Sequence, residues 1–408
     1  MKVLLLTGVF SPCPQSASQR VTSFAQVLSS EHVEVFVLAS TCCLKRMERV
    51  PLGRGVTVYD LKSPRVLLST SSVLINPFVS LLYFFASMFL TISKKIDLVL
   101  ASVPNGETAI AGFLLSKMFK IPFIIDVRDR YPPPAEEFPF LELHVPSLMN
   151  EILITLFRIL YKKSNGILCV SKAHIKELVV AGVRPERIRF LPNGADITIY
   201  KPCSSEARRR IRVKYGLHIE KLIFVYAGSL VSYYPVINAI AGLKELSRER
   251  KNVQLLIISH TAYSDHEKIV EKLGLEDAVR FMGPLSVSVT AEILSACDVG
   301  VQIYRGEKYF KGEYGGKIFS YMSCGLPVMA SGPRGSVIDE MIQEHRIGVF
   351  MGEPSQNNFA EGFSFFVENK GKLSSMSENA RKTVEEYYDR RKLGLKLASL
   401  VTQLCKDK

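Results

Sequence analysis

The segment Gly315–Gly332 reads GGKIFSYMSCGLPVMASG, and it joins a glycine pair and a single lysine to a helix-length apolar pattern. Gly315 and Gly316 lack a Cβ atom, so the backbone can approach a ligand closely and present N–H groups at the start of the helix expected from Ile318 to Cys324. Lys317 adds a full positive charge at the same point. The segment therefore predicts a phosphate-binding loop that leads into a helix.

The end of this segment also predicts how the chain continues. Gly325 can adopt the left-handed conformation that ends a helix, Pro327 prevents its continuation, and the apolar residues that follow indicate a buried strand. The same alternation of short apolar strands and helical patterns runs through the whole chain, which is typical of parallel sheets covered by helices. The expected strands are Val3–Thr7, Val33–Leu38, Leu98–Ala101, Phe123–Asp126, Gly166–Val170, Ile188–Leu191, Leu222–Ala227, Val253–Ser259, Val279–Met282, Val299–Ile303, Pro327–Ala330 and Gly348–Phe350.

The length of the chain predicts two domains, because 408 residues, 47% of them apolar, exceed one ordinary core. The break is expected within Leu191–Pro202, where Pro-Asn-Gly disrupts regular structure and Lys-Pro restarts the chain. The sequence thus predicts two doubly wound α/β domains of Rossmann type. Their expected bounds are residues 1–196 and 197–385, and residues 386–408 are expected to form a helix that packs back toward the first domain.

The cysteines and the charge limit the class of protein. Eight cysteines are scattered without a C-x-x-C pair or zinc-type spacing, which predicts buried thiols in a reducing, cytoplasmic compartment and no metal site. The N-terminal run MKVLLLTGVF lacks a small-residue cleavage site, so we expect a first buried strand rather than a signal peptide. The net charge of +13 is dispersed, which favours anionic ligands or an anionic membrane surface over nucleic acid.

The segment Val73–Ile92 contains twenty residues without a charge, a length that permits a membrane-spanning helix. Asn76 and Pro77 near its start favour instead a buried helix or one that docks on a membrane. Lys94 and Lys95 follow at once, as expected for a helix that lies on anionic lipid. We therefore expect peripheral contact with the inner face of a membrane.

The chain contains six segments whose order and spacing form a pattern, namely KVLLLTGVFSPCPQSASQR, FIIDVRDRYP, AGVRPERIRFLPNGADITIYKP, FVYAGSLVSYY, VRFMGPLS and YGGKIFSYMSCGLPVMAS. In this order and spacing they resemble the retaining glycosyltransferases of family 4, also called group 1. The resemblance extends over nearly the whole chain and implies the GT-B fold, in which two facing Rossmann-like domains enclose a cleft. It implies acceptor binding by the first domain and nucleotide-sugar binding by the second.

The resemblance assigns the donor site to the second domain. The lysine that matches Lys317 meets the donor diphosphate in the family, and a charge-assisted contact of this kind is worth about 1.5 to 3 kcal/mol. Backbone near Gly283 would hold the edge of the nucleobase. The residues expected to contact the diphosphate and the rest of the donor are Gly228, Ser229, Gly315, Gly316, Lys317 and Ser320, with Met282 and Gly283 at the nucleobase.

The chain departs from the family pattern at two cationic positions. Many relatives have an arginine where this chain has Ser229 and a lysine where it has Tyr234. Some relatives carry the same serine and tyrosine, so we interpret the pair as a subgroup variant. Arg305 or Arg334 is a candidate source of the missing charge.

A second departure concerns the paired glutamates of the family, which would fall at Gly312 and Ser320. Glu313 is displaced by one residue and is the candidate catalytic carboxylate, with an exposed loop acid as the alternative. Ser320 can offer the ribose one hydroxyl where a glutamate would accept two hydrogen bonds. These changes affect catalysis more than nucleotide binding.

The acceptor side is expected to use residues of the first domain. Ser16 occupies a position where the family usually has a glycine, and Arg20 lies one turn into the next helix, placed for an acceptor phosphate or for a surface ion pair. Arg128 and Asp129 follow a strand at the usual ligand edge of an α/β sheet, and we expect acceptor binding by Arg128 and a catalytic role for Asp129. An internal pair between an arginine and an aspartate, Asp126 included, is the alternative.

These observations predict an enzyme that transfers a sugar from a nucleoside-diphosphate sugar to a lipid-linked or polysaccharide acceptor. The chain contains no D-x-D sequence, so the expected mechanism uses neither a metal ion nor a cofactor. The missing glutamates motivate an alternative, a GT-B-fold binding or accessory subunit with impaired catalysis. A nucleotide-sugar epimerase is a third reading, but it would need an acid/base carboxylate set that the sequence does not provide.

Overall fold

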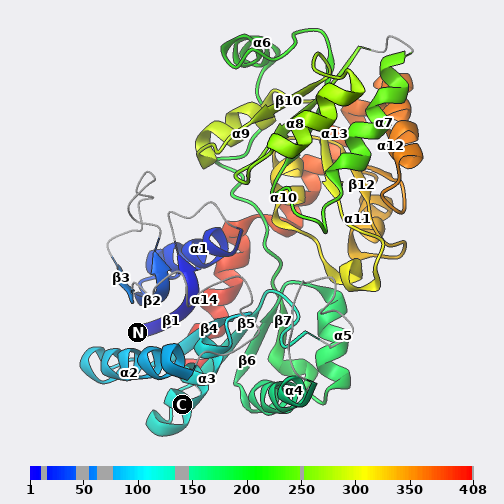
Figure 1. Ribbon diagram of the computed structural model, residues 1–408. Coiled ribbons are helices and arrows are strands. Elements are labelled where there is room, and N and C mark those ends of the chain that lie inside the picture. Colours follow the sequence, from blue (N-terminus) through cyan, green and yellow to red (C-terminus); the bar gives the residue numbers. More distant parts are fainter. Residues whose placement is uncertain (11–15, 43–54, 62–76, 134–146, 249–251, 407–408) are drawn as a thin grey trace. The chain divides into compact units, whose positions relative to one another are not determined.

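A computed structural model describes residues 1–10, 16–42, 55–61, 77–133, 147–248 and 252–406 (Figure 1). Contacts divide the chain into two units. The first comprises Met1–Pro192 and Arg391–Lys408, and the second comprises Asn193–Arg390. The division therefore falls inside the linker expected from the sequence, and the C-terminal segment joins the first unit.

The first unit contains a seven-stranded parallel sheet with the order β3-β2-β1-β4-β5-β6-β7. Chain order runs outward from β1 in one direction and from β4 in the other, as in a doubly wound sheet. The strands are β1 (Lys2–Phe10), β2 (Glu34–Cys42), β3 (Val56–Asp60), β4 (Leu98–Val103), β5 (Phe123–Val127), β6 (Gly166–Cys169) and β7 (Ile188–Phe190).

Helices cover both faces of this sheet. Successive side chains of a strand point to opposite faces, and β1 accordingly places Leu4 and Leu6 in one apolar cluster and Val3 and Leu5 in another. The first cluster packs against α2, α3, α4 and α5, and the second packs against α1 and α14. The helices are α1 (Ser16–Ser30), α2 (Pro77–Lys94), α3 (Gly106–Phe119), α4 (Ser147–Lys163), α5 (Lys172–Val180) and α14 (Arg390–Lys406), with a short 3-10 helix at Pro185–Arg187.

The second unit contains a six-stranded parallel sheet with the order β10-β9-β8-β11-β12-β13. Its strands are β8 (Leu222–Ala227), β9 (Val253–Ile258), β10 (Val279–Met282), β11 (Val299–Ile303), β12 (Val328–Ser331) and β13 (Gly348–Phe350). The helices are α6 (Ser205–Lys214), α7 (Val236–Arg248), α8 (Ser264–Leu273), α9 (Val287–Ser295), α10 (Gly316–Ser323), α11 (Val337–His345), α12 (Gln356–Glu368) and α13 (Leu373–Thr383), with 3-10 helices at Lys308–Gly312 and Lys370–Lys372 and a π-helical turn at Val384–Tyr388.

Strand β11 shows how the second sheet is covered. Val299, Val301 and Ile303 belong to an apolar cluster that includes residues of α7 and α12. Gly300 and Gln302 point to the other face, where the Tyr321 ring of α10 lies against Gly300. Helix α10 therefore packs directly on the centre of the sheet.

All twelve strands expected from the sequence are present, within a few residues at their ends. The sequence analysis missed β3, the edge strand that pairs with β2. Its residues are mostly half-buried, so it lacks the continuous apolar run by which the other strands were recognised. The helix expected from residues 386–408 is α14, which begins at Arg390, directly after Asp389, whose backbone is extended.

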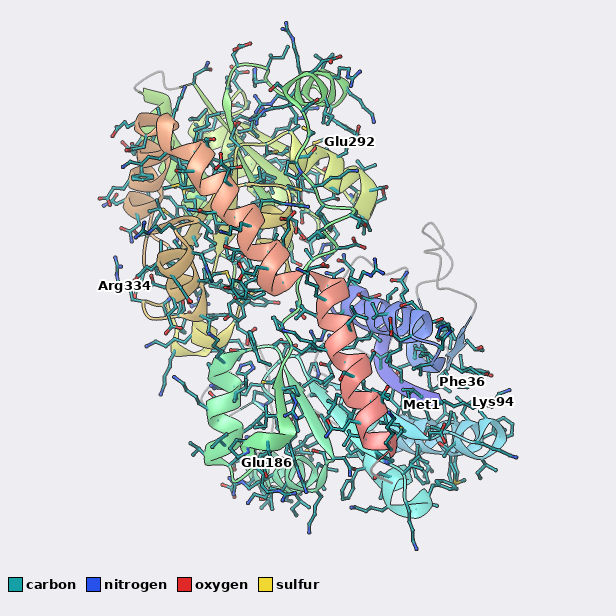
Figure 2. The ribbon with its side chains drawn as sticks, turned by 180° about the vertical axis from the view of Figure 1, so that it is seen from behind. Met1, Phe36, Lys94, Glu186, Glu292 and Arg334 are labelled. Atoms are coloured by element: carbon teal, nitrogen blue, oxygen red, sulfur yellow. The ribbon has the colours of Figure 1, made fainter. Side chains whose placement is uncertain are left out.

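Helix α2 contains most of the uncharged segment Val73–Ile92, and its first residues, 73–76, lie outside the described part of the chain. Within the described residues, no helix combines the length and apolarity needed to cross a membrane. Tyr83 and Leu90 of α2 are buried against the sheet. At its end, Lys94 places its ammonium 5.9 Å from the centroid of the Phe36 ring of β2 (Figure 2).

Candidate functional site

The second sheet has its topological switch point between β8 and β11, because chain order runs outward from these two neighbouring strands. In open α/β sheets, ligands bind beside the carboxyl ends of the strands at this point. The residues that follow β8 are Gly228 and Ser229, and those that follow β11 include Tyr304. Helix α10 begins at Gly316 and packs on β11, which brings its N-terminus to the same sheet.

Lys317 lies in the first turn of α10 and enters a pocket of aromatic rings. Its ammonium is 4.2 Å from the ring centroid of Tyr226 and 4.1 Å from that of Tyr234. It also donates a hydrogen bond of 3.2 Å to the Tyr226 hydroxyl, which in turn donates to the carbonyl of Ser229 at 2.7 Å. No carboxylate among the described residues forms an ion pair with Lys317. The cation is thus held by aromatic faces and a phenol rather than by a negative charge.

Two glycines make room for this lysine and for a ligand. A Cβ atom on Gly228 would lie 3.0 Å from the Lys317 ammonium nitrogen. At Gly315, the residue before α10, a Cβ atom would lie 2.6 Å from the Tyr304 hydroxyl, and φ is +67°. Both the close approach and the positive φ require glycine at position 315. The backbone at the start of α10 is therefore open, as a bound anion would need.

The surroundings of Lys317 lower the pKa of its ammonium group. Burial of the ammonium lowers the pKa of Lys317 to about 7, from 10.5 for a free lysine. The neighbouring Tyr226 hydroxyl gives no compensating charge, because burial raises the pKa of Tyr226 well above its usual value. An anion beside Lys317 would restore the charged form, so this site favours an anionic ligand.

Polar loops after β8 and β9 meet beside this pocket. The Ser229 hydroxyl lies 3.3 Å from Nε2 of His260, and the Leu230 N–H donates to the Thr261 hydroxyl at 2.9 Å. After β10, a Cβ atom on Gly283 would lie 2.2 Å from the Ser259 carbonyl oxygen, so glycine is required there as well. The predicted donor residues Gly228 and Ser229 and the predicted nucleobase residues near Gly283 thus all follow strands at one edge of the sheet.

The carboxylate positions of the site differ from the predicted family pattern, as expected from the sequence. Gly312 is buried at the end of a 3-10 helix, and Glu313 follows it as a half-buried residue two positions before Gly315. Ser320 is half-buried in α10, near the buried side chain of Tyr200. Glu313 lies next to the glycine loop.

The sequence analysis missed Gln302 on β11. Its side chain is 0% exposed, and neither its amide nitrogen nor its amide oxygen has a hydrogen-bond partner among the described residues. The Nε2 atom lies 3.2 Å from the position that a Cβ atom on Gly315 would occupy. A buried amide without partners lowers the free energy of unfolding by about 1 to 3 kcal/mol. We therefore infer that Gln302, which lies beneath the glycine loop, has a role in the site. Within the strand pattern, Gln302 was one polar residue in an apolar run, and that was the available signal.

The two arginines considered as replacement cations make contacts of their own. Nε of Arg305 lies 2.8 Å from Oε1 of Glu307. The guanidinium of Arg334, labelled in Figure 2, packs over Gly352, where a Cβ atom would lie 3.2 Å from Nη2. Neither of these two contacts involves Lys317, Tyr226 or Tyr234.

The first unit contains a closed ion pair where the sequence analysis expected a candidate acceptor site. Arg20 and Asp126 are 1% and 0% exposed, and Nη2 of Arg20 lies 2.7 Å from Oδ1 of Asp126. Nη1 of Arg20 donates to the Pro192 carbonyl at 2.8 Å, and the guanidinium lies 4.5 Å from the Phe24 ring centroid. The structure thus shows the internal arginine–aspartate alternative for these two residues, because the guanidinium is occupied within the unit.

Arg128 and Asp129 follow β5 and remain partly exposed. Nε of Arg128 donates to the Val103 carbonyl at 3.0 Å. Burial lowers the pKa of Arg128, and burial raises the pKa of Asp129, with Arg128 opposing the rise. Ser16 is the first residue of α1, but its side chain lies outside the described part of the chain.

Glu107 is a further carboxyl group that the sequence analysis missed. It lies in the first turn of α3, directly after β4, at the switch point between β1 and β4. Burial raises the pKa of Glu107. Its signal in the sequence was weak, because a glutamate in the first turn of a helix is common for reasons of helix stability alone.

The two parallel-sheet units, each with a ligand edge at a switch point, correspond to the GT-B glycosyltransferase fold in solved structures. The crystal structure of HepE from Anabaena in complex with UDP has a TM-score of 0.73 with 17% identity, covering 99% of this chain and 100% of that one. The structure of WaaG, a glycosyltransferase involved in lipopolysaccharide biosynthesis, has a TM-score of 0.70 with 17% identity, covering 98% and 99%.

Family models and a curated relative define the class more closely. The model for glycosyl transferases group 1 matches residues 207–383, and the model for glycosyltransferase family 4 matches residues 17–199. An uncharacterised glycosyltransferase of Methanocaldococcus jannaschii is 22% identical over 399 residues, which is 96% of each chain. The chain therefore belongs to the group 1 glycosyltransferases of family 4, and it is a sugar-transferring enzyme with the GT-B fold. The resemblance noted in the sequence is confirmed.

Proposed function

We propose that this enzyme transfers a sugar from a nucleoside-diphosphate sugar to a lipid-linked or polysaccharide acceptor, with retention of configuration and without a metal ion or cofactor. The observation that carries the proposal is the Lys317 ammonium, which has no carboxylate partner in the part of the chain that the structure describes and lies at the start of α10 beside Gly228 and Gly315. A diphosphate supplies the negative charge that this pocket lacks. HepE, which shares the fold, has been crystallised with UDP and with UDP-glucose, so uridine diphosphate is the first nucleotide to test.

The proposed chemistry stabilises the departing diphosphate with groups of the second unit. The acceptor hydroxyl oxygen forms the new bond to the sugar carbon, the bond from that carbon to the diphosphate breaks, and the acceptor proton passes to a phosphate oxygen. Lys317 and the N–H groups at the start of α10 stabilise the charge that develops on the leaving group. Gly228, Ser229, Gly315 and Gly316 provide the backbone around the phosphates. Under this proposal Met282 and Gly283 hold the nucleobase edge, and Ser320 lies near the ribose.

The carboxylates of the proposed mechanism are Glu313 and Asp129. Glu313 lies two residues before Gly315 and is assigned to the transferred sugar. Asp129 is assigned to the reacting hydroxyl of the acceptor, which its carboxylate would orient by accepting a hydrogen bond until the proton passes to the phosphate. Arg128 is assigned to an anionic group of the acceptor, and Ser16 to the same region. Arg20 positions this edge through its pair with Asp126.

Helix α2 supports the membrane part of the proposal. Five large apolar residues along one face of α2 are exposed, and Phe89 is the most exposed of them at 68%. They recur with the spacing of a helix face, and the opposite face is buried against the sheet. An outward apolar stripe of this size is typical of helices that lie on a bilayer. The five residues are Leu81, Leu82, Phe85, Phe89 and Ile92.

The decisive test replaces Lys317 with methionine, which keeps the apolar stem and removes the charge. We expect the affinity for the nucleotide and the rate of donor hydrolysis to fall roughly 10- to 100-fold, because a charge-assisted contact contributes about 1.5 to 3 kcal/mol. Calorimetry with UDP and a hydrolysis assay over a panel of nucleotide sugars measure the two effects. Lys272→Met, an exposed lysine on α8, is the matched control.

The outcomes separate the proposal from the alternative of an impaired subunit. Equal nucleotide affinity in Lys317→Met and the wild type would remove the diphosphate assignment. Tight nucleotide binding with no turnover of any donor, in the presence of a membrane extract as acceptor source, would favour the impaired subunit. The replacement of both family glutamates, by Gly312 and Ser320, is the specific observation that keeps this second candidate in view.

A further inference from the structure

A cavity of about 700 Å³ opens on the surface of the first unit between α4 and α5. Arg158 and Lys162 enter it from α4, and Lys176 enters it from α5. Val180 and Gly182 form part of its wall on the α5 side. The cavity belongs to neither of the strand edges described above, and the glycosyl transfer chemistry makes no use of it.

The electrostatic balance of this cavity is strongly positive. Glu177 is its one acidic lining residue, and this carboxylate forms an ion pair with Arg130. Arg158, Lys162 and Lys176 have no acidic partner among the described residues. Three cations therefore share a concave surface without compensation, an arrangement that attracts an anion.

Gly182 lies against one of these cations. Its φ is +89°, which favours glycine, and a Cβ atom on it would lie 2.8 Å from both Cε and Nζ of Lys162. Lys162 lines the cavity with an exposed side chain, so its ammonium is accessible to an anion from solution.

The outer face of α4 is apolar beside this basic cavity. Leu148 is 70% exposed, and Ile152 and Ile159 lie on the same side of the helix and are also exposed. The opposite side is buried, with Leu153 and Phe157 in the core. A surface helix of a soluble protein normally turns its apolar side inward, so α4 carries an additional apolar stripe that faces outward.

The cavity and the stripe meet at one end of α4. Val180, which is 89% exposed, lines the cavity, and Ile159 lies on α4 between Arg158 and Lys162 in the sequence. An apolar stripe flanked by lysine and arginine is the pattern of a helix that lies in the interfacial region of a bilayer. Helix α4 contacts α3, and α3 contacts α2, so the stripe continues the helix layer that carries the exposed apolar residues of α2.

We propose that this cavity binds the phosphate of an anionic lipid headgroup while the apolar stripe of α4 rests against the bilayer. This inference rests on the proposed function at a membrane, and it adds that the first unit recognises lipids with a negatively charged headgroup. Arg158 supplies a planar pair of donors for two phosphate oxygens, and Lys162 and Lys176 supply point charges on either side. The apolar stripe selects a lipid over a soluble phosphate because only the lipid brings an apolar surface with it.

The test is co-sedimentation of the full chain with vesicles of phosphatidylcholine, alone or with about 30% phosphatidylglycerol. The variant replaces Arg158, Lys162 and Lys176 by glutamine. We expect binding to the anionic vesicles to weaken roughly 100-fold, at about fivefold for each cation removed near a charged surface. Binding to the neutral vesicles should be unchanged, because the apolar stripe is intact.

A matched control removes three exposed cations of the second unit, Lys201, Arg209 and Lys272, also by glutamine. Equal weakening in this control would overturn the proposal, because the effect would then come from net charge. Unchanged binding in the cavity variant would overturn it as well. Wild-type vesicle binding that is competed fully by soluble glycerol phosphate would assign the cavity to a soluble anion and overturn the lipid assignment.

Donor hydrolysis without any membrane separates this proposal from the proposed function. The cavity variant should hydrolyse a nucleotide sugar in solution at the wild-type rate, because none of its three residues lies in the second unit. Lost vesicle binding with retained hydrolysis supports the cavity. Normal hydrolysis with unchanged vesicle binding contradicts the cavity alone, whereas a wild type that neither binds nor hydrolyses any donor contradicts the proposed function.

Discussion

Arg20 is a buried cation of the first unit and Lys317 is a half-buried cation of the second, and the two have opposite surroundings. In the first unit, Arg20 is fully buried and binds Asp126 through two nitrogens, and a carbonyl and an aromatic ring complete its surroundings. In the second unit, Lys317 contacts two tyrosine rings and the hydroxyl of one of them, and none of the described carboxylates forms an ion pair with it. The first cation is neutralised within the protein, and the second is left for a ligand.

This difference explains why a positive charge alone does not identify a binding site. A buried ion pair serves the fold, because each partner offsets the desolvation cost of the other. The desolvation cost of the Lys317 ammonium is not offset by an internal negative charge, and for this reason the pKa of Lys317 is lowered. A bound anion would offset this cost.

The largest effect is expected at the pair in the first unit. Arg20→Met leaves the Asp126 carboxylate buried without its partner, and loss of one member of a buried pair costs about 3 to 5 kcal/mol. We therefore expect the free energy of unfolding of this unit to fall by that amount. Urea unfolding followed by far-UV circular dichroism measures the change.

A double variant, Arg20→Met with Asp126→Leu, provides the control. It removes both charges, so most of the lost stability should return. If the single and double variants were equally unstable, the cost would come from packing around Phe24 rather than from an isolated charge.

The next effect is the pH dependence of nucleotide affinity at Lys317. The pKa of Lys317 is about 7 in the free protein, and a bound diphosphate favours the charged form and raises it. The affinity should therefore be highest below pH 7 and fall about tenfold per pH unit above it, until the pKa of the complex is reached. Calorimetry between pH 6.5 and about 8.5, in buffers of different ionisation enthalpy, should detect uptake of about one proton on binding at the upper end.

The same shift has a consequence for stability with a definite sign. Because the pKa of Lys317 is about 7 when folded and near 10.5 when unfolded, the unfolded chain binds more protons between these values, and this lysine makes folding more favourable as the pH rises through that range. Lys317→Met should abolish both the proton uptake and this contribution. A variant with unchanged pH dependence would assign the titration to another group.

The fold was largely predictable because its signals are local and repeated. Each central strand is an apolar run long enough to be recognised, whereas β3 is an edge strand that contacts the sheet through β2 and shows no such run. The linker was predictable from its Pro-Asn-Gly break, within a few residues of the division after Pro192.

The site was less predictable because its chemistry depends on contacts between distant residues. Lys317 could be singled out from its glycines, but the tyrosine pocket joins positions 226, 234 and 317, which no local pattern links. The Arg20–Asp126 pair spans 106 positions, so the sequence left an ion pair and an acceptor contact as alternatives. The one signal for Gln302 was a polar residue inside an apolar run, and its burial, which follows from α10 lying over β11, could not be predicted from that signal alone.

The smallest effect is expected at Gln302. This residue extends the comparison between Arg20 and Lys317 from charged groups to neutral polar groups. We expect Gln302→Leu to raise the free energy of unfolding of the second unit by about 1 to 2 kcal/mol, since it removes a buried amide that has no partner among the described residues. Donor hydrolysis should fall about three- to tenfold if the amide supports the Gly315 backbone when the diphosphate binds. Thermal unfolding and the hydrolysis assay measure the two effects.

A second buried glutamine of the same sheet provides the matched control. Gln254 on β9 is also buried, but its Oε1 accepts a hydrogen bond of 3.4 Å from the His218 N–H. Gln254→Leu removes a partner and leaves that N–H without it, so the free energy of unfolding should fall where Gln302→Leu raises it. Changes of opposite sign in the free energy of unfolding would show that Gln302, like Lys317, destabilises the free protein and makes its favourable contact only when the ligand is bound. A loss of stability in both variants would mean that Gln302 contributes to packing and not to ligand binding. Of the two residues, only Lys317 would then be assigned to the ligand.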